Sequence, residues 1–167
     1  MYRLRFIWII LVSFFTKPKK ITEDFNLTFR VIPFIDTDFT RMFTHSYSTY
    51  MGLARWHYVF ASELRAVAIR NKWAPVTTSE TMTYRRSIKA FSKVILKTKL
   101  LTWDEEIFYL EHSFLVNGKE MAHCTLEGLI RAPQGIQKPG DVFTASGLQE
   151  DAPQFSEKLK EWISFLR

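Results

Sequence analysis

The sequence is poor in cysteine, since Cys124 is the only one among its 167 residues. A single cysteine cannot form an internal disulfide and is too few for a cysteine metal site. Glycine and proline are also sparse, at six residues each, which excludes collagen-like and low-complexity sequence. Charged residues make up 24% of the chain against 47% hydrophobic residues, a balance that excludes a disordered chain. The length therefore predicts one folded domain of ordinary size.

Aromatic and basic residues, by contrast, are abundant. Aromatic residues account for 16% of the chain, which suits a compact core or a domain that also buries surface against a partner or a membrane. The formal net charge of +6 favours an anionic partner. The basic residues have no recognition-helix, RNA-binding-strand or zinc-finger context, so we expect no nucleic-acid partner. No ligand-spaced pair accompanies His57, His112 or His123, so we expect no metal site.

Residues 1–20 combine a largely apolar run, 6–15, with basic residues on both sides. This run is too short for a transmembrane helix, which needs about 20 residues. The cationic stretch 16–20 stands where a signal peptide would have its small-residue cleavage site, so we expect the segment to be retained. Two interpretations stay open: a contact with an anionic membrane surface, or a terminal helix packed on its own domain or on a dimer mate. We expect a cytoplasmic location, with membrane association if the first interpretation holds.

The hydrophobic pattern of the rest of the chain predicts one long helix and five strands. A short alternating strand, 27–33, comes first and is closed by Pro33. Residues 46–70 place apolar side chains at helical spacing on more than one side, which predicts a long helix. Four β-rich runs follow, and the tight connectors between them predict successive hairpins in an antiparallel meander. The runs are 76–88, 94–103, 107–116 and 121–131, and the connectors are 89–92, 104–106 and Asn117-Gly118.

A helix that is apolar on several sides is normally enclosed by other elements, and the strands can enclose it. We therefore predict an α+β hotdog fold, in which a five-stranded antiparallel sheet wraps around one long central helix. Residues 133–153 predict a loop or ordered tail, and 153–166 predict a short amphipathic helix, so the fold has N- and C-terminal helical extensions. The predicted parts are the terminal segment 1–20, a hotdog domain over 21–132, and the loop and helix of 133–167.

Several short motifs strengthen this prediction. They are Asp36-Thr-Asp38, Tyr47 with Met51 and Arg55, Lys72-Trp73-Ala-Pro75, Tyr84-Arg85-Arg86-Ser87-Ile88, and the run from Thr102-Trp103-Asp104 to Glu111. On these residues the chain resembles the 4-hydroxybenzoyl-CoA thioesterase-like hotdog proteins, over about 27–132 with a weaker echo at 159–165. It is most similar to the branch that includes eukaryotic thioesterase superfamily member six and its bacterial relatives. The resemblance implies acyl-CoA thioester hydrolysis, with no cofactor beyond the coenzyme A that is part of the substrate.

The acidic pair just before the predicted helix is the first catalytic candidate. Thioester cleavage needs a carboxylate to attack the carbonyl or activate water, and donors to hold the oxyanion. In the resembling thioesterases the second Asp of an Asp-x-Asp motif is the nucleophile or base, and Asp38 falls on it. The alternative is that Asp36 and Asp38 only cap the start of the helix. We favour the catalytic role for Asp38.

Two alignments assign His45 differently. Some of the resembling proteins carry an assisting His seven residues after the second Asp, and His45 has that spacing from Asp38. Aligned through Tyr47, the chain is one residue short, and the His-Met-Asn-Asn run of the nearest branch reads Arg41-Met-Phe-Thr44. The resemblance thus implies Asp38 and His45 as catalytic residues, with Thr44 and Tyr47 at the helix start as oxyanion or pocket residues. Under the second alignment, His45 is only a helix-entry residue.

A basic cluster follows the second predicted strand. Arg85, Arg86 and Lys89 lie at what we predict to be the first hairpin, a placement suited to the phosphates of coenzyme A at a subunit boundary. The alternative is a solvated hairpin end. One five-stranded sheet also leaves an edge open to pairing, so we expect at least a homodimer. The function predicted is an acyl-CoA thioesterase; the alternative is a non-catalytic acyl-chain-binding protein or a structural hotdog dimer at a membrane surface.

Overall fold

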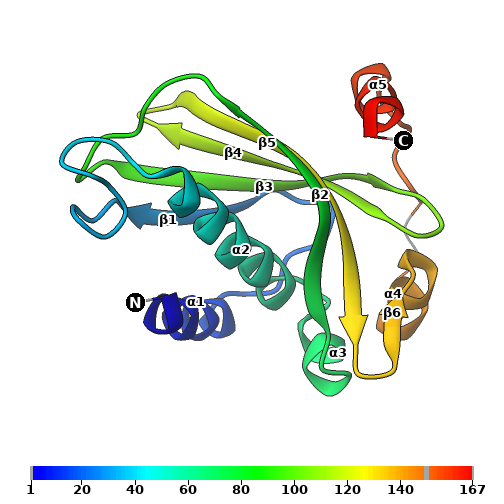
Figure 1. Cartoon of the computed structure of the whole chain (residues 1–167). Coiled ribbons are helices and arrows are strands. Elements are labelled where there is room, and N and C mark those ends of the chain that lie inside the picture. The colour runs from blue at the N-terminus through cyan, green and yellow to red at the C-terminus, as the bar shows by residue number, and fades with distance from the viewer. Residues whose placement is uncertain (1, 149–150, 167) are drawn as a thin grey trace.

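The computed structural model describes residues 2–148 and 151–166. A strongly curved sheet surrounds one long helix, and shorter helices lie outside the sheet (Figure 1). In chain order the elements are α1 (Tyr2–Phe15), β1 (Phe25–Arg30), α2 (Thr44–Ala61), α3 (Arg65–Arg70), β2 (Ala74–Tyr84), β3 (Lys93–Trp103), β4 (Phe108–Val116), β5 (Lys119–Ala132), β6 (Gly135–Gln137), α4 (Pro139–Ser146) and α5 (Glu157–Leu166).

The sheet is antiparallel, with the strand order β1-β3-β4-β5-β2 and the short β6 paired with β5. Its five long strands agree with the five predicted runs, and the prediction of an α+β hotdog fold is confirmed. Asn117 and Gly118 have φ of 49° and 75°, as a type I′ turn between β4 and β5 requires. The connector 104–106 also joins paired strands, β3 and β4.

The predicted meander is wrong at its first hairpin, because β2 pairs with β5 and not with β3. Residues 85–92 instead cross from the β2 edge of the sheet to β3, which lies beside β1. Backbone hydrogen bonds tie this crossover to the loop after β1: Met42 N–H donates to Ile88 O at 2.9 Å, and Ala90 N–H donates to Thr40 O at 3.2 Å. The four-residue connector 89–92 suggested a hairpin turn. These long-range hydrogen bonds instead direct the chain to β3, toward the other edge of the sheet.

The central helix is shorter than predicted. Residues Tyr50, Met51 and Leu53 are buried, and α2 is apolar on several sides because the sheet covers one side and α1 covers another. It ends at Ala61, where Ser62 turns to extended geometry. The Ser62 hydroxyl donates to Val59 O at 3.0 Å and accepts from Leu64 N–H at 3.3 Å, which replaces helical hydrogen bonds. The separate helix α3 follows, so the single helix predicted to residue 70 is wrong.

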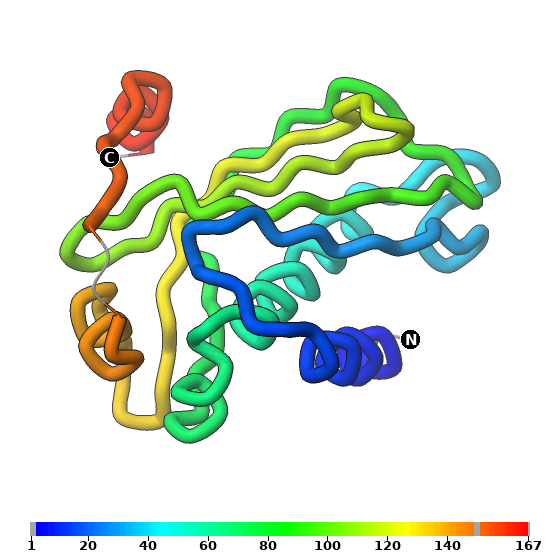
Figure 2. Tube along the Cα trace, turned by 180° about the vertical axis from the view of Figure 1, so that it is seen from behind, coloured from blue at the N-terminus to red at the C-terminus, as the bar shows by residue number. Residues whose placement is uncertain are grey.

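The N-terminal helix packs on its own domain. Figures 1 and 2 show α1 lying alongside α2 and beneath β1. The Phe6 ring meets Trp56 edge to face at 5.4 Å, and Ser13 Oγ lies 2.8 Å from His57 Nδ1. The opposite side of α1 is apolar and exposed: Leu4, Ile7, Leu11 and Phe15 are 70, 54, 49 and 90% exposed. None of the helices in the described part of the chain has the length and hydropathy of a membrane-spanning segment.

The C-terminal part holds more regular structure than predicted. The predicted loop after β5 contains β6, which extends the sheet, and α4, where the Phe143 ring packs 4.7 Å from Trp103. The amphipathic helix predicted near the C-terminus is present as α5, which buries Leu159. Trp162 Nε1 of α5 donates to Thr81 Oγ1 of β2 at 2.9 Å, so α5 lies against the outer part of the sheet.

Candidate active site

Asp36 is a buried structural residue at the base of the loop between β1 and α2. Its side chain accepts two hydrogen bonds from Arg5, at 2.6 and 3.0 Å, one from the Tyr50 hydroxyl at 2.9 Å and one from Ile32 N–H at 2.8 Å. Burial alone would raise the pKa of Asp36, but these donors together hold its pKa below the usual value. The carboxylate therefore stays ionised and fixes α1, α2 and the loop together.

Asp38 lies exposed at the tip of the same loop. Its Oδ1 accepts from Thr40 N–H at 2.7 Å and from Arg41 N–H at 2.8 Å, and these backbone bonds to Arg41 and Thr40 lower the pKa of Asp38. A bridge between Thr37 and Met42 closes the loop behind it. Asp38 is therefore an ionised, accessible carboxylate that also stabilises a tight turn.

His45 lies in the first turn of α2, exposed, with its ring stacked on Phe43 at a centroid distance of 5.0 Å. No hydrogen bond or ion pair joins His45 to Asp38 among the residues that the structure describes. The predicted pair thus lies on neighbouring segments without direct contact. Its catalytic role stays a prediction.

A pocket of about 240 Å³ opens beside the start of α2 and brings four predicted residues together. Thr44 and Tyr47 come from α2, and Arg85 and Arg86 come from the segment that follows β2. Tyr47 is buried and meets Tyr84 edge to face at 5.1 Å, so the floor is aromatic. Burial raises the pKa of the Tyr47 phenol, and a hydrogen bond from the Ile88 backbone partly offsets this rise. The residues lining the pocket are Met42, Thr44, Tyr47, Tyr84, Arg85, Arg86 and Ser87.

The two arginines of this pocket differ in their electrostatic environment. Both backbone N–H groups donate to Met121 O at 2.9 Å, which fixes the segment near the start of β5. Arg85 Nε pairs with Glu120 at 2.9 Å, so part of its charge is neutralised. Among the described side chains, no carboxylate lies within ion-pair distance of Arg86. Lys89 lies outside the pocket, where its backbone forms a bridge with Arg41.

The start of α2 supplies polar groups to the same region. Phe43 is the N-cap residue, has extended geometry and makes no side-chain cap hydrogen bond, and its carbonyl accepts from Ser46 N–H at 3.0 Å. The first N–H groups of a helix have no intrahelical partner, and they favour negative charge through the helix dipole. A negatively charged oxygen beside Thr44 would therefore meet unoccupied donors on one side and the Arg86 guanidinium on the other. Such an arrangement can hold an oxyanion near a phosphate-bearing group.

The model of the thioesterase-like superfamily matches residues 32–163, which include α2, strands β2 to β6 and this pocket. The chain belongs to the thioesterase-like superfamily. Among its relatives, Protein THEM6 of Danio rerio is 28% identical over 170 residues, covering 99% of this chain and 82% of that protein. Protein THEM6 of Drosophila melanogaster is 24% identical over 131 residues, covering 77% of this chain and 66% of that protein.

Solved structures similar to this thioesterase-like chain agree on the fold. A gentisyl-coenzyme A thioesterase is 21% identical with a TM-score of 0.61, covering 73% of this chain and 99% of its own. A hypothetical protein of Staphylococcus aureus, solved in complex with CoA, is 14% identical with a TM-score of 0.63, covering 86% of this chain and 96% of its own. At these identities the similarity establishes the hotdog fold alone.

Three further residues of this thioesterase-like site were not assigned a site role from the sequence. Met42, Tyr84 and Ser87 line the pocket, and Tyr84 and Ser87 belong to the motif that carried the family resemblance. Their positions in the sequence, next to Thr44 and to the arginine pair, could have suggested them as site residues. Arg5, which binds Asp36, stood only in the basic group around the apolar N-terminal run. No sequence signal links it to a residue 31 positions away.

Proposed function

We propose that this protein hydrolyses acyl-CoA thioesters beside the start of α2, with the coenzyme A bound in the pocket there. Membership of the thioesterase-like superfamily supports thioester hydrolysis as the reaction class. The observation that carries the more specific proposal is the pocket itself, which joins an uncapped helix start to an arginine pair. Coenzyme A offers the matching groups, because its phosphates are anionic and its thioester carbonyl becomes an oxyanion during hydrolysis.

In the proposed reaction, Asp38 acts on a water molecule as general base. The carboxylate takes a proton from water while the water oxygen bonds to the thioester carbonyl carbon, and the oxyanion rests on the N–H groups at the start of α2. The carbon–sulfur bond then breaks, and the thiolate takes up the proton to leave as free coenzyme A. Asp38 meets two requirements of a base: it is ionised, and its Oδ2 lies outside the two turn hydrogen bonds.

Replacement of Asp38 by Asn tests this role. Asn keeps an oxygen acceptor for the turn but cannot take the proton, so we expect kcat on acyl-CoA substrates to fall by about 10²–10⁴-fold. The measurement is the hydrolysis rate over a panel of acyl chain lengths. The matched control is Asp141→Asn, at an exposed position of α4. Equal rates for wild type and Asp38→Asn would remove Asp38 from the mechanism.

The arginine pair predicts how the substrate binds. The Arg85→Ala/Arg86→Ala variant should bind acyl-CoA about tenfold more weakly and bind an acyl-pantetheine analogue without the nucleotide as wild type does. Because Arg86, unlike Arg85, has no carboxylate partner among the described residues, Arg86→Ala should account for most of the loss. Lys158→Ala, which removes an exposed lysine of α5 outside the pocket, is the control and should leave both affinities unchanged. A double variant that binds both ligands like wild type would leave the arginines as a solvated surface.

A second function has its own support, namely acyl-chain binding or a structural role at a membrane surface without hydrolysis. Neither Asp38 nor His45 lines the pocket, and Arg41 to Thr44 depart from the His-bearing run of the resembling proteins. Absence of hydrolysis by the wild type at every chain length would favour this second function.

We further propose a homodimer. The outer edge of β2 carries no strand partner among the described residues, and its residues are exposed or half-buried. Open strand edges favour pairing with another chain. Pairing through β2 would place the Tyr84–Ser87 side of the pocket next to a second subunit, as a site shared between subunits requires.

A further inference from the structure

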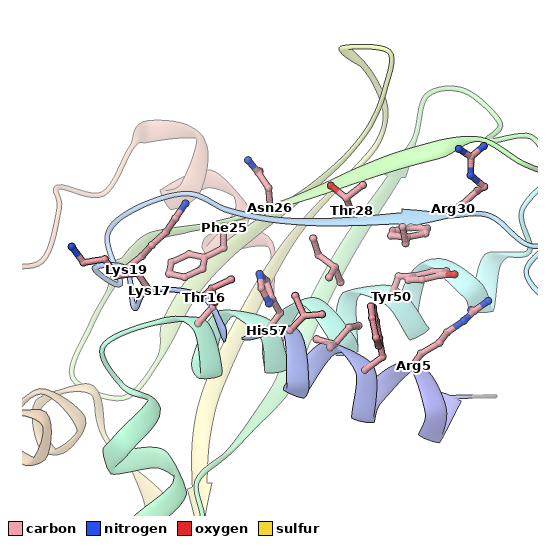
Figure 3. Close-up of a pocket in the computed structure, with 16 residues that line it drawn as sticks. Arg5, Thr16, Lys17, Lys19, Phe25, Asn26, Thr28, Arg30, Tyr50 and His57 are labelled. Atoms are coloured by element: carbon pink, nitrogen blue, oxygen red, sulfur yellow. The ribbon is translucent and has the colours of Figure 1, made fainter. Parts of the chain in front are cut away.

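A second, larger cavity lies on the other side of α2. It is a groove of about 590 Å³ between α1, β1 and α2 (Figure 3), and it shares no lining residue with the pocket beside the start of α2. Its walls are mainly apolar, with Ile9 and Val12 from α1, Phe25 and Leu27 from β1, and Ala61 from α2. Small-molecule sites typically enclose about 300–1,000 Å³ and are lined mostly by apolar side chains. The groove therefore has the size and lining of a ligand site.

One face of α1 is dedicated to this groove. Its lining residues Arg5, Trp8, Ile9 and Val12, with Thr16 just beyond the helix, recur at intervals of one, three and four positions, so they share a face. Leu11, directly before Val12, lies on another face and does not line the groove, although it is also partly exposed. This neighbouring pair supplies a matched test of what the groove does.

The ends of the groove are cationic, and they differ in how far their charge is neutralised. Figure 3 shows Lys17 and Lys19 at one end and Arg5 and Arg30 at the other. Arg5 is neutralised by Asp36, whereas Arg30 Nη1 donates to the Phe91 carbonyl at 3.2 Å, so one of the two charges at this end is paired with a carboxylate. In the described part of the chain, no carboxylate lies within ion-pair distance of Lys17 or Lys19. The Lys19 ammonium has only a carbonyl at 3.3 Å and the Phe25 ring at 5.7 Å, so positive charge remains available at this end.

The middle of the groove is uncharged. Ser13 Oγ donates to Ile9 O at 2.7 Å, so its lone pairs accept the hydrogen bond from His57 Nδ1 at 2.8 Å. This fixes the tautomer of His57. Burial, with a smaller contribution from Lys19, lowers the pKa of His57, so the imidazole is neutral at pH 7. A ligand in the groove thus meets an uncharged, mainly apolar wall and then two available ammonium groups.

We propose that this groove binds a single-chain anionic amphiphile, with the hydrocarbon chain along Val12 and Leu27 and the anionic head group at Lys17 and Lys19. An apolar channel matches an unbranched chain, and the unneutralised lysines match a carboxylate or phosphate head. A long-chain fatty acid and a lysophosphatidic acid share this chemistry. The proposal does not depend on thioester hydrolysis, because neither ligand contains a thioester.

Binding of cis-parinaric acid, a fluorescent 18-carbon fatty acid, to the full-length protein tests the apolar part. The probe is used below its critical micelle concentration. Val12→Trp fills the groove and should weaken binding about tenfold or more, whereas Leu11→Trp should bind as wild type does. Far-UV circular dichroism and melting curves verify the fold of both variants. The proposal would be overturned if Val12→Trp bound the probe with wild-type affinity. It would also be overturned if Leu11→Trp lost as much affinity as Val12→Trp, because the probe would then adsorb to the outer face of α1.

A lysine pair tests the charged end and decides the question even if Val12→Trp does not fold. Lys17→Gln/Lys19→Gln should weaken the binding of cis-parinaric acid about tenfold. The affinity for palmitic acid methyl ester, which has no charge, is calculated from displacement of the probe and should stay unchanged. Lys20→Gln/Lys158→Gln removes two exposed lysines outside the groove and should have no effect. Equal effects of the two double variants would overturn the proposal. Tighter competition by palmitoyl lysophosphatidic acid than by palmitate supports a phosphate head, and the reverse order supports a carboxylate.

Discussion

Asp36→Ala should lower the free energy of unfolding by about 3 kcal/mol or more, although the neighbouring Asp38 is the predicted catalytic residue. Removal of the carboxylate leaves the Arg5 guanidinium, the Tyr50 hydroxyl and the Ile32 N–H without their acceptor. Loss of one partner of a buried ion pair costs about 3–5 kcal/mol, because the remaining charge is desolvated and unpaired. Chemical denaturation at pH 7 measures this change.

Asp38→Ala is the matched control, since it removes the same side chain two residues away. Asp38 is exposed, and its turn bonds can be replaced by water, so the free energy of unfolding should stay close to that of wild type. Arg5→Met/Asp36→Asn removes both charges together and should be more stable than the sum of the single changes predicts. Equal stability of Asp36→Ala and Asp38→Ala would contradict the assignment of Asp36 as the residue that holds the loop to α1 and α2.

Hydrophobic patterning predicted most of the elements, because the relevant signal is local. Alternation identified β1, β-rich composition identified the four longer strands, and the Asn117-Gly118 turn was predicted from the preference of these residues for positive φ. The end of α2 at Ala61 was missed. The residues after it are still apolar at helical spacing, and the break depends on hydrogen bonds of a single hydroxyl, that of Ser62.

The strand order could not be read from local patterns. A four-residue connector such as 89–92 is compatible with a hairpin, and only its long-range bonds to the loop after β1 direct β3 away from β2. This error affects the setting of Arg85 and Arg86. They lie at the start of a crossover, where the Met121 carbonyl fixes both backbones, and not at a hairpin tip.

The sequence could predict which residues form the candidate site, but it could not predict how their side chains are paired. Thr44 and Tyr47 were proposed from the family resemblance, Arg85 and Arg86 were proposed from a basic cluster, and the fold gathers all four in one pocket. The distinction between Arg85 and Arg86 depends on Glu120, which comes from a different strand. The different roles of Asp36 and Asp38 likewise depend on distant residues, because Arg5 and Tyr50 donate to the Asp36 carboxylate and make it a buried structural group.

Acidification should lower the free energy of unfolding already between pH 7 and 5, at pH values above those at which most carboxylates titrate. His112 is fully buried on β4, with Nδ1 3.0 Å from Thr98 Oγ1, and Nε2 has no hydrogen-bond partner among the described residues. Burial, and then the charges of Arg55 and His123, lower the pKa of His112 from 6.5 to about 3. The imidazole is therefore neutral in the folded protein at pH 5, where an unfolded chain would protonate it.

The sign of the effect follows from this difference in bound protons. Between pH 6.5 and 3 the unfolded state binds one more proton at His112, so the free energy of unfolding falls as the pH falls, by up to about 1.4 kcal/mol per unit. From pH 7 to 5 the expected loss from His112 is about 2 kcal/mol. His57, whose pKa is also lowered by burial, adds a loss of the same sign. Urea denaturation of the wild type at both pH values measures the total.

His112→Gln assigns the loss to a residue. Gln cannot be protonated, so the variant should lose about 2 kcal/mol less than wild type between pH 7 and 5, even though it is less stable at pH 7. His45→Gln, which removes an exposed imidazole, is the matched control. If His112→Gln and wild type lost the same free energy on acidification, proton uptake would have to occur elsewhere. His112 would then be protonated in the folded core, which its burial beside Arg55 opposes.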